Sequence, residues 1–286
     1  MVSVSEIQDA KQDEKLCKAM YKLVRGHGED AVKNALAQIS TTPDFGKFAW
    51  CIYSVNQECF PGLNDGEVSK LMYLATMSTH DGTILVKKRT QSRRSDIQFS
   101  LDISRQQASL FYFAATEGGY ITEDGDDLVI SNNVFVRGTI SPERLERLAL
   151  RGKYATRMYF PAVRYLYESS ELSIRRVLKY LHKLLPILNR EYNIVCHNPL
   201  ETDIDKIEPM KIGEFCEAIG YDKSNSGRIS RNLFDAKIPV GDHYENVIVR
   251  SSNMRPRRDD ICICLNPRIF YAGGKESAEM VLTAFR

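Results

Sequence analysis

The chain has 286 residues, a formal net charge of +2 and 43% hydrophobic residues. This hydrophobic content excludes a largely disordered chain, and no apolar run in the sequence is long enough to span a membrane. Because the net charge is small, affinity for nucleic acid would have to come from local clusters of charge.

The N-terminal residues lack the basic-then-apolar order of a secretion signal, which predicts a cytoplasmic protein. The seven cysteines include no Cys-x-x-Cys pair. We therefore expect reduced thiols and neither a zinc site nor a redox motif. At this length, two domains with connecting segments fit better than one large core.

Residues 1–60 are predicted to form an N-terminal helical region. Apolar residues recur at helical spacing in two stretches, separated by Gly26 and Gly28 and ended by Pro43. The only tryptophan, Trp50, follows and is interpreted as a core residue. The region is a candidate arm that docks on the next domain or on a second copy of the chain, so a homodimer stays open.

Residues 61–140 are predicted to form a winged helix-turn-helix domain. A β-branched run at residues 83–86 predicts a strand, and Ser104 is the expected N-cap of the recognition helix. Asp124-Gly125 is a hairpin-turn signal, and residues 128–136 are expected to be the returning strand of the wing. The recognition helix is predicted to bury a stripe made of Ala108, Phe111, Tyr112 and Ala115.

Residues 141–171 are predicted to be a helical connector. Ser141 and Pro142 are typical of a helix start, and further helix, broken at Pro161, is expected to continue toward Tyr167. Glycine and serine are too sparse here for a flexible linker.

Residues 172–286 are predicted to form a second winged helix-turn-helix domain. An amphipathic helix is expected at residues 210–219, followed by strands at residues 247–249 and 261–265. The two halves align without a gap over about nineteen residues; Asp102, Ile103, Ala108, Phe111, Ala115 and Tyr120 fall on Gly220, Tyr221, Ser226, Ile229, Leu233 and Ile238. The expected fold class is therefore α+β, mainly α, with two tandem winged helix-turn-helix domains, an N-terminal helical region and a helical connector.

The first residues of a recognition helix reach base edges in the major groove, where arginine suits guanine and glutamine suits adenine. Small residues near the start of the second helix would also let its backbone approach phosphate. In the first half the candidate DNA contacts are Arg105, Gln106, Gln107 and Ser109. In the second half they are Lys223, Ser224, Asn225, Arg228 and Arg231. The alternative for both sets is the solvated polar face of an ordinary helix.

Basic clusters near both units are candidate phosphate contacts. In the first half these residues are Lys87, Lys88, Arg93 and Arg94. At the expected tip of the second wing they are Arg255, Arg257 and Arg258, beside the acidic Asp259 and Asp260. A solvated loop is the alternative in each case.

Catalytic and metal-binding functions find no support in the sequence. The five histidines are isolated and lack the spacing of metal ligands. The phosphate-binding pattern Gly-x-x-x-x-Gly-Lys does not occur. We therefore expect a non-enzyme without cofactor or metal.

Residues 265–274 (LNPRIFYAGG) and residues 220–229 (GYDKSNSGRI) carry a resemblance to a known family. They resemble the closing strand and the recognition-helix start of winged-helix proteins from plasmids and phages of Gram-positive bacteria, namely RepL-type replication initiators and related phage regulators. The resemblance implies binding of double-stranded DNA at an origin or an operator through the second domain. The chain departs from that family by its two copies and its N-terminal region, so replication initiation and transcription regulation both stay open.

A second hypothesis comes from a different class of function. In it the chain is a non-catalytic interaction protein, and its winged helices dock on a polymerase or another replisome component. The small net charge suits this hypothesis equally well.

Overall fold

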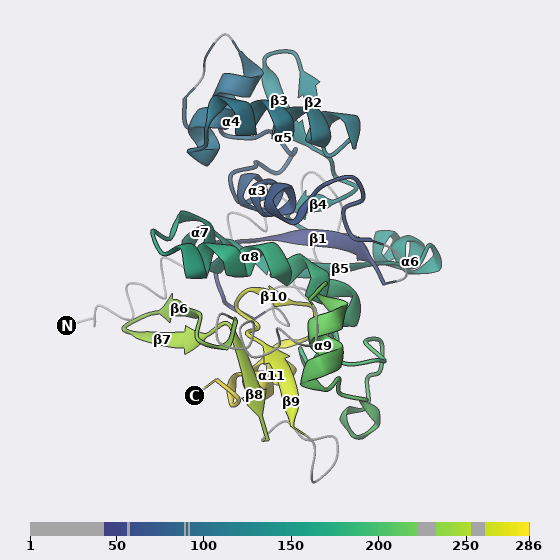
Figure 1. Cartoon of the computed structure of the whole chain (residues 1–286). Coiled ribbons are helices and arrows are strands. Elements are labelled where there is room, and N and C mark those ends of the chain that lie inside the picture. The colour runs from purple at the N-terminus through teal and green to yellow at the C-terminus, as the bar shows by residue number, and fades with distance from the viewer. Residues whose placement is uncertain are drawn as a thin grey trace, which may run out of the picture. The chain divides into compact units, whose positions relative to one another are not determined.

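The computed structural model describes residues 43–55, 58–88, 90, 92–221, 233–252 and 261–285 (Figure 1). The helical stretches expected within residues 1–42 lie outside these ranges. The described part is a mixed α+β fold, with helices arranged around one four-stranded sheet and three two-stranded sheets, all antiparallel. Within this part, no helix combines the length and apolar character needed to cross a membrane.

The four-stranded sheet joins segments that are far apart in sequence. Its strands are β1 (Phe48–Ser54), β4 (Phe135–Arg137), β5 (Lys153–Tyr159) and β10 (Phe270–Tyr271), in the order β10-β5-β1-β4. The two central strands, β1 and β5, pair along their whole length (Figure 1). Two expectations are therefore wrong locally: β1 is a strand inside the expected N-terminal helical region, and β5 is a strand inside the expected helical connector.

The first half continues from β1 with three helices and a hairpin. They are α3 (Asp65–Thr76), α4 (Arg93–Leu101), α5 (Arg105–Glu117), β2 (Ile121–Asp124) and β3 (Asp127–Ile130). The strand expected over residues 128–136 is divided in two: β3 pairs with β2, whereas β4 leaves the hairpin and pairs with β1. Helix α6 (Pro142–Leu150) then closes the half and begins, as expected, after the N-cap Ser141.

The second half follows β5 in a similar order. Its helices are α7 (Phe160–Glu168), α8 (Leu172–Leu184), α9 (Ile212–Ala218) and α11 (Lys275–Leu282). Short 3₁₀ turns lie at η1 (Leu185–Ile187) and η2 (Ile204–Lys206). Its hairpins are β6 (Lys237–Val240) with β7 (His243–Asn246), and β8 (Ile248–Ser251) with β9 (Cys262–Leu265).

Matching backbone hydrogen bonds relate the two hairpins β2–β3 and β8–β9. Ile84 donates to the Leu128 carbonyl at 2.7 Å, and Val195 donates to the Ile263 carbonyl at 2.8 Å. The return bonds also match, because Ile130 donates to Gly82 at 2.9 Å and Leu265 donates to Asn193 at 3.0 Å. A short segment after α3 in the first half, and after α8 in the second half, thus adds to the hairpin as a third strand.

The turn that follows α4 is repeated after α9. Asp102 ends α4 with φ of 52°, and Gly220 follows α9 with φ of 80°. The next residue closes the turn in the same way, since Ile103 donates to Gln98 at 3.3 Å and Tyr221 donates to Cys216 at 2.8 Å. The structure therefore confirms the matches of Asp102 with Gly220 and of Ile103 with Tyr221.

The match of Tyr120 with Ile238 is wrong. The Tyr120 carbonyl accepts a hydrogen bond from Ser131, and the equivalent bond in the second half runs from Asn266 to Val247. Val247 therefore occupies the place of Tyr120. The hairpin β6–β7 is an insertion that lies between the third helix and the wing-like hairpin of the second half.

The register of the central sheet has an internal symmetry. Trp50 pairs with Arg157 across the two central strands. Phe135 stands opposite the residue after Trp50, and Phe270 stands opposite the residue after Arg157. A local two-fold axis thus passes through the Trp50–Arg157 pair and relates β1, β4 and α6 to β5, β10 and α11.

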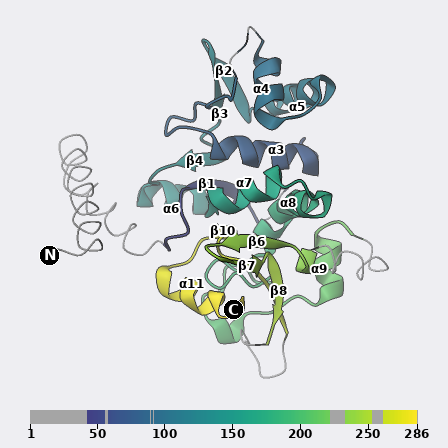
Figure 2. The same ribbon diagram turned by 90° about the vertical axis from the view of Figure 1, so that its left-hand side faces the viewer.

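Helices cover one face of this sheet and hold the two halves together. Helix α3 contacts both α7 and α8, as the second view also shows (Figure 2). Buried residues of β1, α3, α8 and α9 belong to one continuous core that also contains Phe111 of α5. On the other face, α6 packs Leu145 and Leu148 against Trp50 and Ile52.

Candidate nucleic-acid interface

Helix α5 presents the first set of predicted contacts on its open side. Ala108, Phe111 and Ala115 are fully buried, as the stripe predicted, whereas Tyr112, its fourth member, is only half-buried. Arg105 and Gln106 in the first turn are exposed, and Ser109 is half-buried. These three side chains therefore lie where a groove-reading helix would place them.

Gln107, another predicted contact, takes part in the N-terminal cap of α5. Ser104 caps α5 by accepting a hydrogen bond from the Gln107 amide at 3.2 Å, and the Gln107 side-chain oxygen accepts one from the Ser104 amide at 3.3 Å. This capping box satisfies two N–H groups at the start of the helix. The side-chain amide oxygen of Gln107 therefore takes part in capping the start of α5.

Two apolar side chains on the outer face of α5 were missed by the sequence analysis. Leu110 is 60% exposed and Phe113 is 52% exposed. The Arg94 guanidinium lies 5.0 Å from the Phe113 ring centre, in cation–π geometry. Gln106, Leu110 and Phe113 follow the spacing i, i+4 and i+7 opposite the buried stripe, and that pattern was readable in the sequence.

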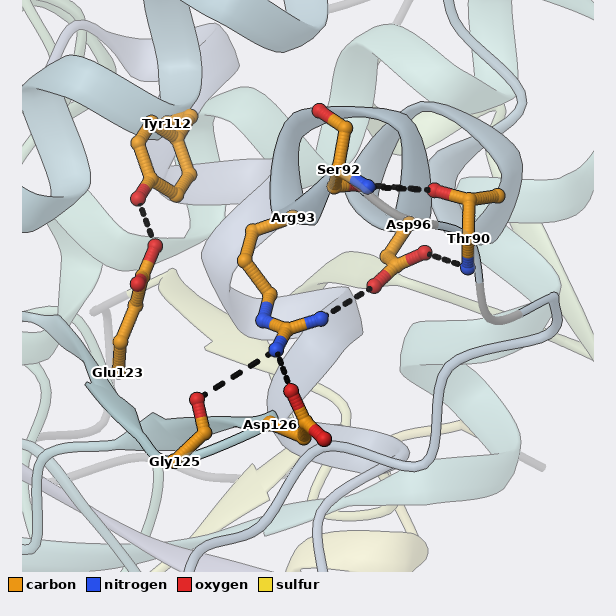
Figure 3. A network of polar contacts seen from close by, with 8 residues as sticks. All are labelled: Thr90, Ser92, Arg93, Asp96, Tyr112, Glu123, Gly125 and Asp126. Carbon is orange, nitrogen blue, oxygen red and sulfur yellow. Dashed lines mark hydrogen bonds and ion pairs between the residues drawn. The ribbon is translucent and has the colours of Figure 1, made fainter.

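Arg93 is held by acidic partners within the first half (Figure 3). Its guanidinium donates to Asp126 Oδ1 at 2.7 Å and to the Gly125 carbonyl at 3.4 Å, and lies 3.6 Å from Asp96 Oδ2. Asp96 is buried and Arg93 is half-buried, so Asp96 holds the guanidinium within α4 while the bonds to Asp126 and Gly125 anchor α4 to the turn of the β2–β3 hairpin. The charge of Arg93 is thus compensated locally, which disfavours the predicted phosphate contact.

A second polar contact fastens α5 to the same hairpin. The Tyr112 hydroxyl donates to the Glu123 carboxylate (Figure 3). Partial burial, together with this hydrogen bond, raises the pKa of Tyr112, so the phenol stays a donor at neutral pH. The hairpin is therefore tied to α4 by Arg93 and to α5 by Tyr112.

The β2–β3 hairpin is acidic, which the sequence analysis did not weigh. Its turn region contains Glu123, Asp124, Asp126 and Asp127. A carboxylate near a DNA phosphate is repelled, so this hairpin is a poor phosphate contact.

The lysines of the nearby basic cluster are more suitable phosphate contacts than this hairpin. Lys87 and Lys88 are exposed, with their ammonium groups 5.5 Å from the Tyr73 ring and 4.6 Å from the Phe99 ring.

The predicted contacts of the second half fall outside the described residues. These are Lys223, Ser224, Asn225, Arg228 and Arg231 of the predicted recognition helix, and Arg255, Arg257 and Arg258 of the predicted wing tip. The flanking elements are described. Helix α9 and its left-handed turn at Gly220 precede the first group, and the paired strands β8 and β9 enclose the second group in sequence.

Nucleophilic chemistry is disfavoured at the described thiols. Burial raises the pKa of Cys59 and that of Cys196 to about 12, so both thiols stay protonated at neutral pH. Across the ranges that the structure describes, no three histidine, cysteine, aspartate or glutamate side chains come together in a way that could hold a metal ion.

The best-defined surface is therefore the one formed by α4, α5 and the lysines beside them. It combines a capped helix with an exposed first turn, a left-handed turn before that helix and a hairpin after it. No protein-family model, curated protein or solved structure matches the chain.

Proposed function

We propose that the chain binds double-stranded DNA sequence-specifically through two winged helix-turn-helix units, one in each half, as a replication initiator or a transcription regulator. The observation that carries the proposal is the repeated set of backbone bonds. Each half has a left-handed turn with the same closing hydrogen bond, after α4 in the first half and after α9 in the second, and adds a third strand to a following hairpin. This order of helix, strand, helix, turn, helix and hairpin is the one that presents a recognition helix to the major groove.

The second unit is the stronger candidate for contact with phosphate. Residues 222–232 carry Lys223, Arg228 and Arg231 against the single acidic residue Asp222. The loop between β8 and β9 has three arginines against two aspartates. The corresponding turn of the first unit is acidic instead. We therefore propose that the second unit supplies most of the binding energy and the first unit adds base contacts through Arg105, Gln106 and Ser109.

The arrangement of the two units sets the form of the DNA site. From the local two-fold axis of the central strands we infer that the two units are related by rotation rather than by translation along the chain. Two-fold related readers bind half-sites of opposite orientation, spaced by about one helical turn. We therefore propose that the DNA site is an imperfect inverted repeat, since the two recognition helices differ in sequence.

The first experiment is a fluorescence-anisotropy titration of the full chain with the DNA that flanks its own gene, against a scrambled duplex, at low and moderate salt. We expect preference for the native duplex and a steep loss of affinity with salt, because phosphate contacts release counterions. The variant Arg228→Glu with Arg231→Glu should abolish the preference. Lys206→Glu with Lys275→Glu makes the same change of charge elsewhere and is the matched control.

Equal affinity for both duplexes would contradict sequence-specific reading, and an unchanged titration by the double variant would contradict the assignment of the second helix. Absence of binding to either duplex would contradict the function itself.

Exposed apolar side chains on α5 favour a second candidate function for the first unit. Leu110 and Phe113 form an outer face that is apolar beside an acidic hairpin, a combination that suits a protein partner such as a polymerase or another replisome component. In this hypothesis, Leu110→Ser with Phe113→Ser would leave DNA affinity unchanged and remove binding of the partner. Loss of DNA affinity in this variant would instead assign the apolar face to base contacts, including thymine methyl groups.

A further inference from the structure

A basic cavity lies at the junction of the two halves, and none of its lining residues belongs to α5. It has a volume of about 230 Å³ and is formed by α6, the start of β5 and the middle of β1. Its lining residues are Ile52, Asn133, Arg144, Arg147, Leu148, Arg151 and Lys153. Figure 1 shows α6 beside the ends of the two central strands.

The sequence explains why four cations converge here. Arg144, Arg147 and Arg151 recur at i, i+3 and i+7, so they lie along one side of α6. The same helix packs Leu145 and Leu148 on the sheet, which fixes the direction of the arginine row. Gly152, with φ of 66°, turns the chain immediately after Arg151 and brings Lys153 of β5 to the same cavity.

In the part of the chain that the structure describes, these four cations have an acidic neighbour in the exposed Glu143, which interacts electrostatically with Arg147. None of them forms an ion pair there with a carboxylate within 4 Å. Arg144 donates to the Asn132 carbonyl at 2.6 Å, and Arg147 Nε donates to the Glu143 carbonyl at 3.3 Å. Carbonyl partners orient the guanidinium groups without neutralising them. The cavity therefore concentrates positive charge, and the mutual repulsion of these groups is relieved when an anion enters.

We propose that this junction cavity binds phosphate groups. Three guanidinium forks and one ammonium can form several charge-assisted hydrogen bonds to the oxygens of one or two phosphates. Two sources share this chemistry. One is the backbone of DNA, whose phosphates would pass the junction if both units read the same duplex. The other is a free polyphosphate.

The test uses the full chain and two probes, inorganic tripolyphosphate and a duplex of random sequence. Isothermal titration calorimetry measures the affinity for tripolyphosphate. Fluorescence anisotropy at several salt concentrations measures the affinity for the duplex. The test variant is Arg147→Gln with Arg151→Gln. The matched control, Lys206→Gln with Lys275→Gln, removes the same charge from exposed sites away from the cavity. Circular dichroism verifies that both variants are folded.

If the site receives the DNA backbone, the test variant should bind the duplex at least tenfold more weakly, and the salt slope should fall by about 1 to 2, since each phosphate contact contributes roughly 0.9. If it receives a free ligand, tripolyphosphate should bind the wild-type chain and lose at least tenfold in the test variant. Effects on both probes would support both sources.

The proposal is overturned if the test variant binds both probes as the control does, or if the wild-type chain binds neither probe. This test is separate from the proposed function, because tripolyphosphate binding does not depend on a DNA site. A failure of sequence preference together with lost tripolyphosphate binding in the test variant would leave this cavity assigned and remove only the specific DNA reader.

Discussion

Trp50 and Arg157 face each other at the centre of the four-stranded sheet and perform equivalent tasks in the two halves. The Trp50 indole donates to the Gly138 carbonyl at 3.0 Å, and the Arg157 guanidinium donates to the Gly273 carbonyl. Gly138 and Gly273 occupy matching places after β4 and β10. The guanidinium also lies 5.2 Å from the indole ring centre, so each half secures its last strand and the two devices contact each other across the local two-fold axis.

Trp50→Phe should destabilise the chain by about 2 kcal/mol, because the Gly138 carbonyl loses its donor and the smaller ring fills less space. Urea unfolding followed by circular dichroism measures this free energy. Phe113→Leu, an exposed aromatic replacement on α5, serves as the control and should change it little. An unchanged urea midpoint for Trp50→Phe would mean that the indole and its hydrogen bond to Gly138 do not stabilise the fold.

His182→Met should reduce the acid sensitivity of the fold. Burial lowers the pKa of His182 to about 4, only partly offset by nearby Asp65, whereas an unfolded histidine titrates near about 6.5. Between these values the unfolded chain binds more protons, so wild-type stability falls as the pH is lowered from about 6.5 toward 4, by up to about 3 kcal/mol. Methionine is apolar, does not titrate and can adapt its shape to a buried position, so it is a suitable replacement.

The measurement for His182 is the free energy of unfolding at pH 7 and at pH 5 for the wild-type chain and the variant. His243→Asn, a replacement at an exposed histidine, is the control. The same loss of stability on acidification in His182→Met as in the wild-type chain would exclude this side chain as the cause.

Among the described residues, Asp102 and Asn193 are the two other than glycine with positive φ, and they should respond oppositely to replacement by glycine. Asp102→Gly should stabilise by about 0.5–1 kcal/mol, because glycine adopts the left-handed turn without a steric penalty and Gly220 already occupies the matching place. Asn193→Gly should destabilise by about 2 kcal/mol, because the Asn193 amide donates to the carbonyls of Leu265 and Phe270 in the core. Thermal unfolding of both variants tests the pair, and equal signs would contradict it.

Arg93 and Arg94 are neighbours in sequence with different expected roles. Arg94→Gln should weaken binding to a DNA duplex, because this exposed guanidinium lies on Phe113 at the outer face of α5. Arg93→Gln should change affinity less and instead speed amide hydrogen exchange in β2 and β3, because it releases the hairpin from Asp126. Anisotropy and hydrogen exchange separate the two effects. Faster hairpin exchange in Arg94→Gln alone would contradict the assignment.

Local signals in the sequence predicted the starts of α5 and α6 and the turn of the β2–β3 hairpin. Ser104 has the short oxygen that caps a helix, and Asp124-Gly125 suits a tight turn between β2 and β3. Such features act over a few residues, so they can be read from one chain. The left-handed turns at Asp102 and Gly220 belong to the same class.

The central sheet was not predictable in this way. Strand β1 pairs with β5 about a hundred residues later, and its almost continuous burial gives it no alternation of apolar and polar residues. Strand β5 includes the buried Arg157, so its sequence looks like that of a polar segment rather than a buried strand. The role of Arg93 was hidden for a similar reason, because its partner Asp126 lies far along the chain and only the folded hairpin brings them together.

The ladder between β1 and β5 has a consequence for the tolerance of a DNA site to changes in length. A flexible linker would allow two readers to follow half-sites moved apart, whereas a sheet hydrogen-bonded along seven residue pairs keeps their separation constant. One extra base pair between half-sites turns the second by about 34° around the helix axis, since a turn contains about 10.5 base pairs. Under the proposed function, the operators or origins that the chain reads should therefore have invariant spacer lengths, even where their base sequences diverge.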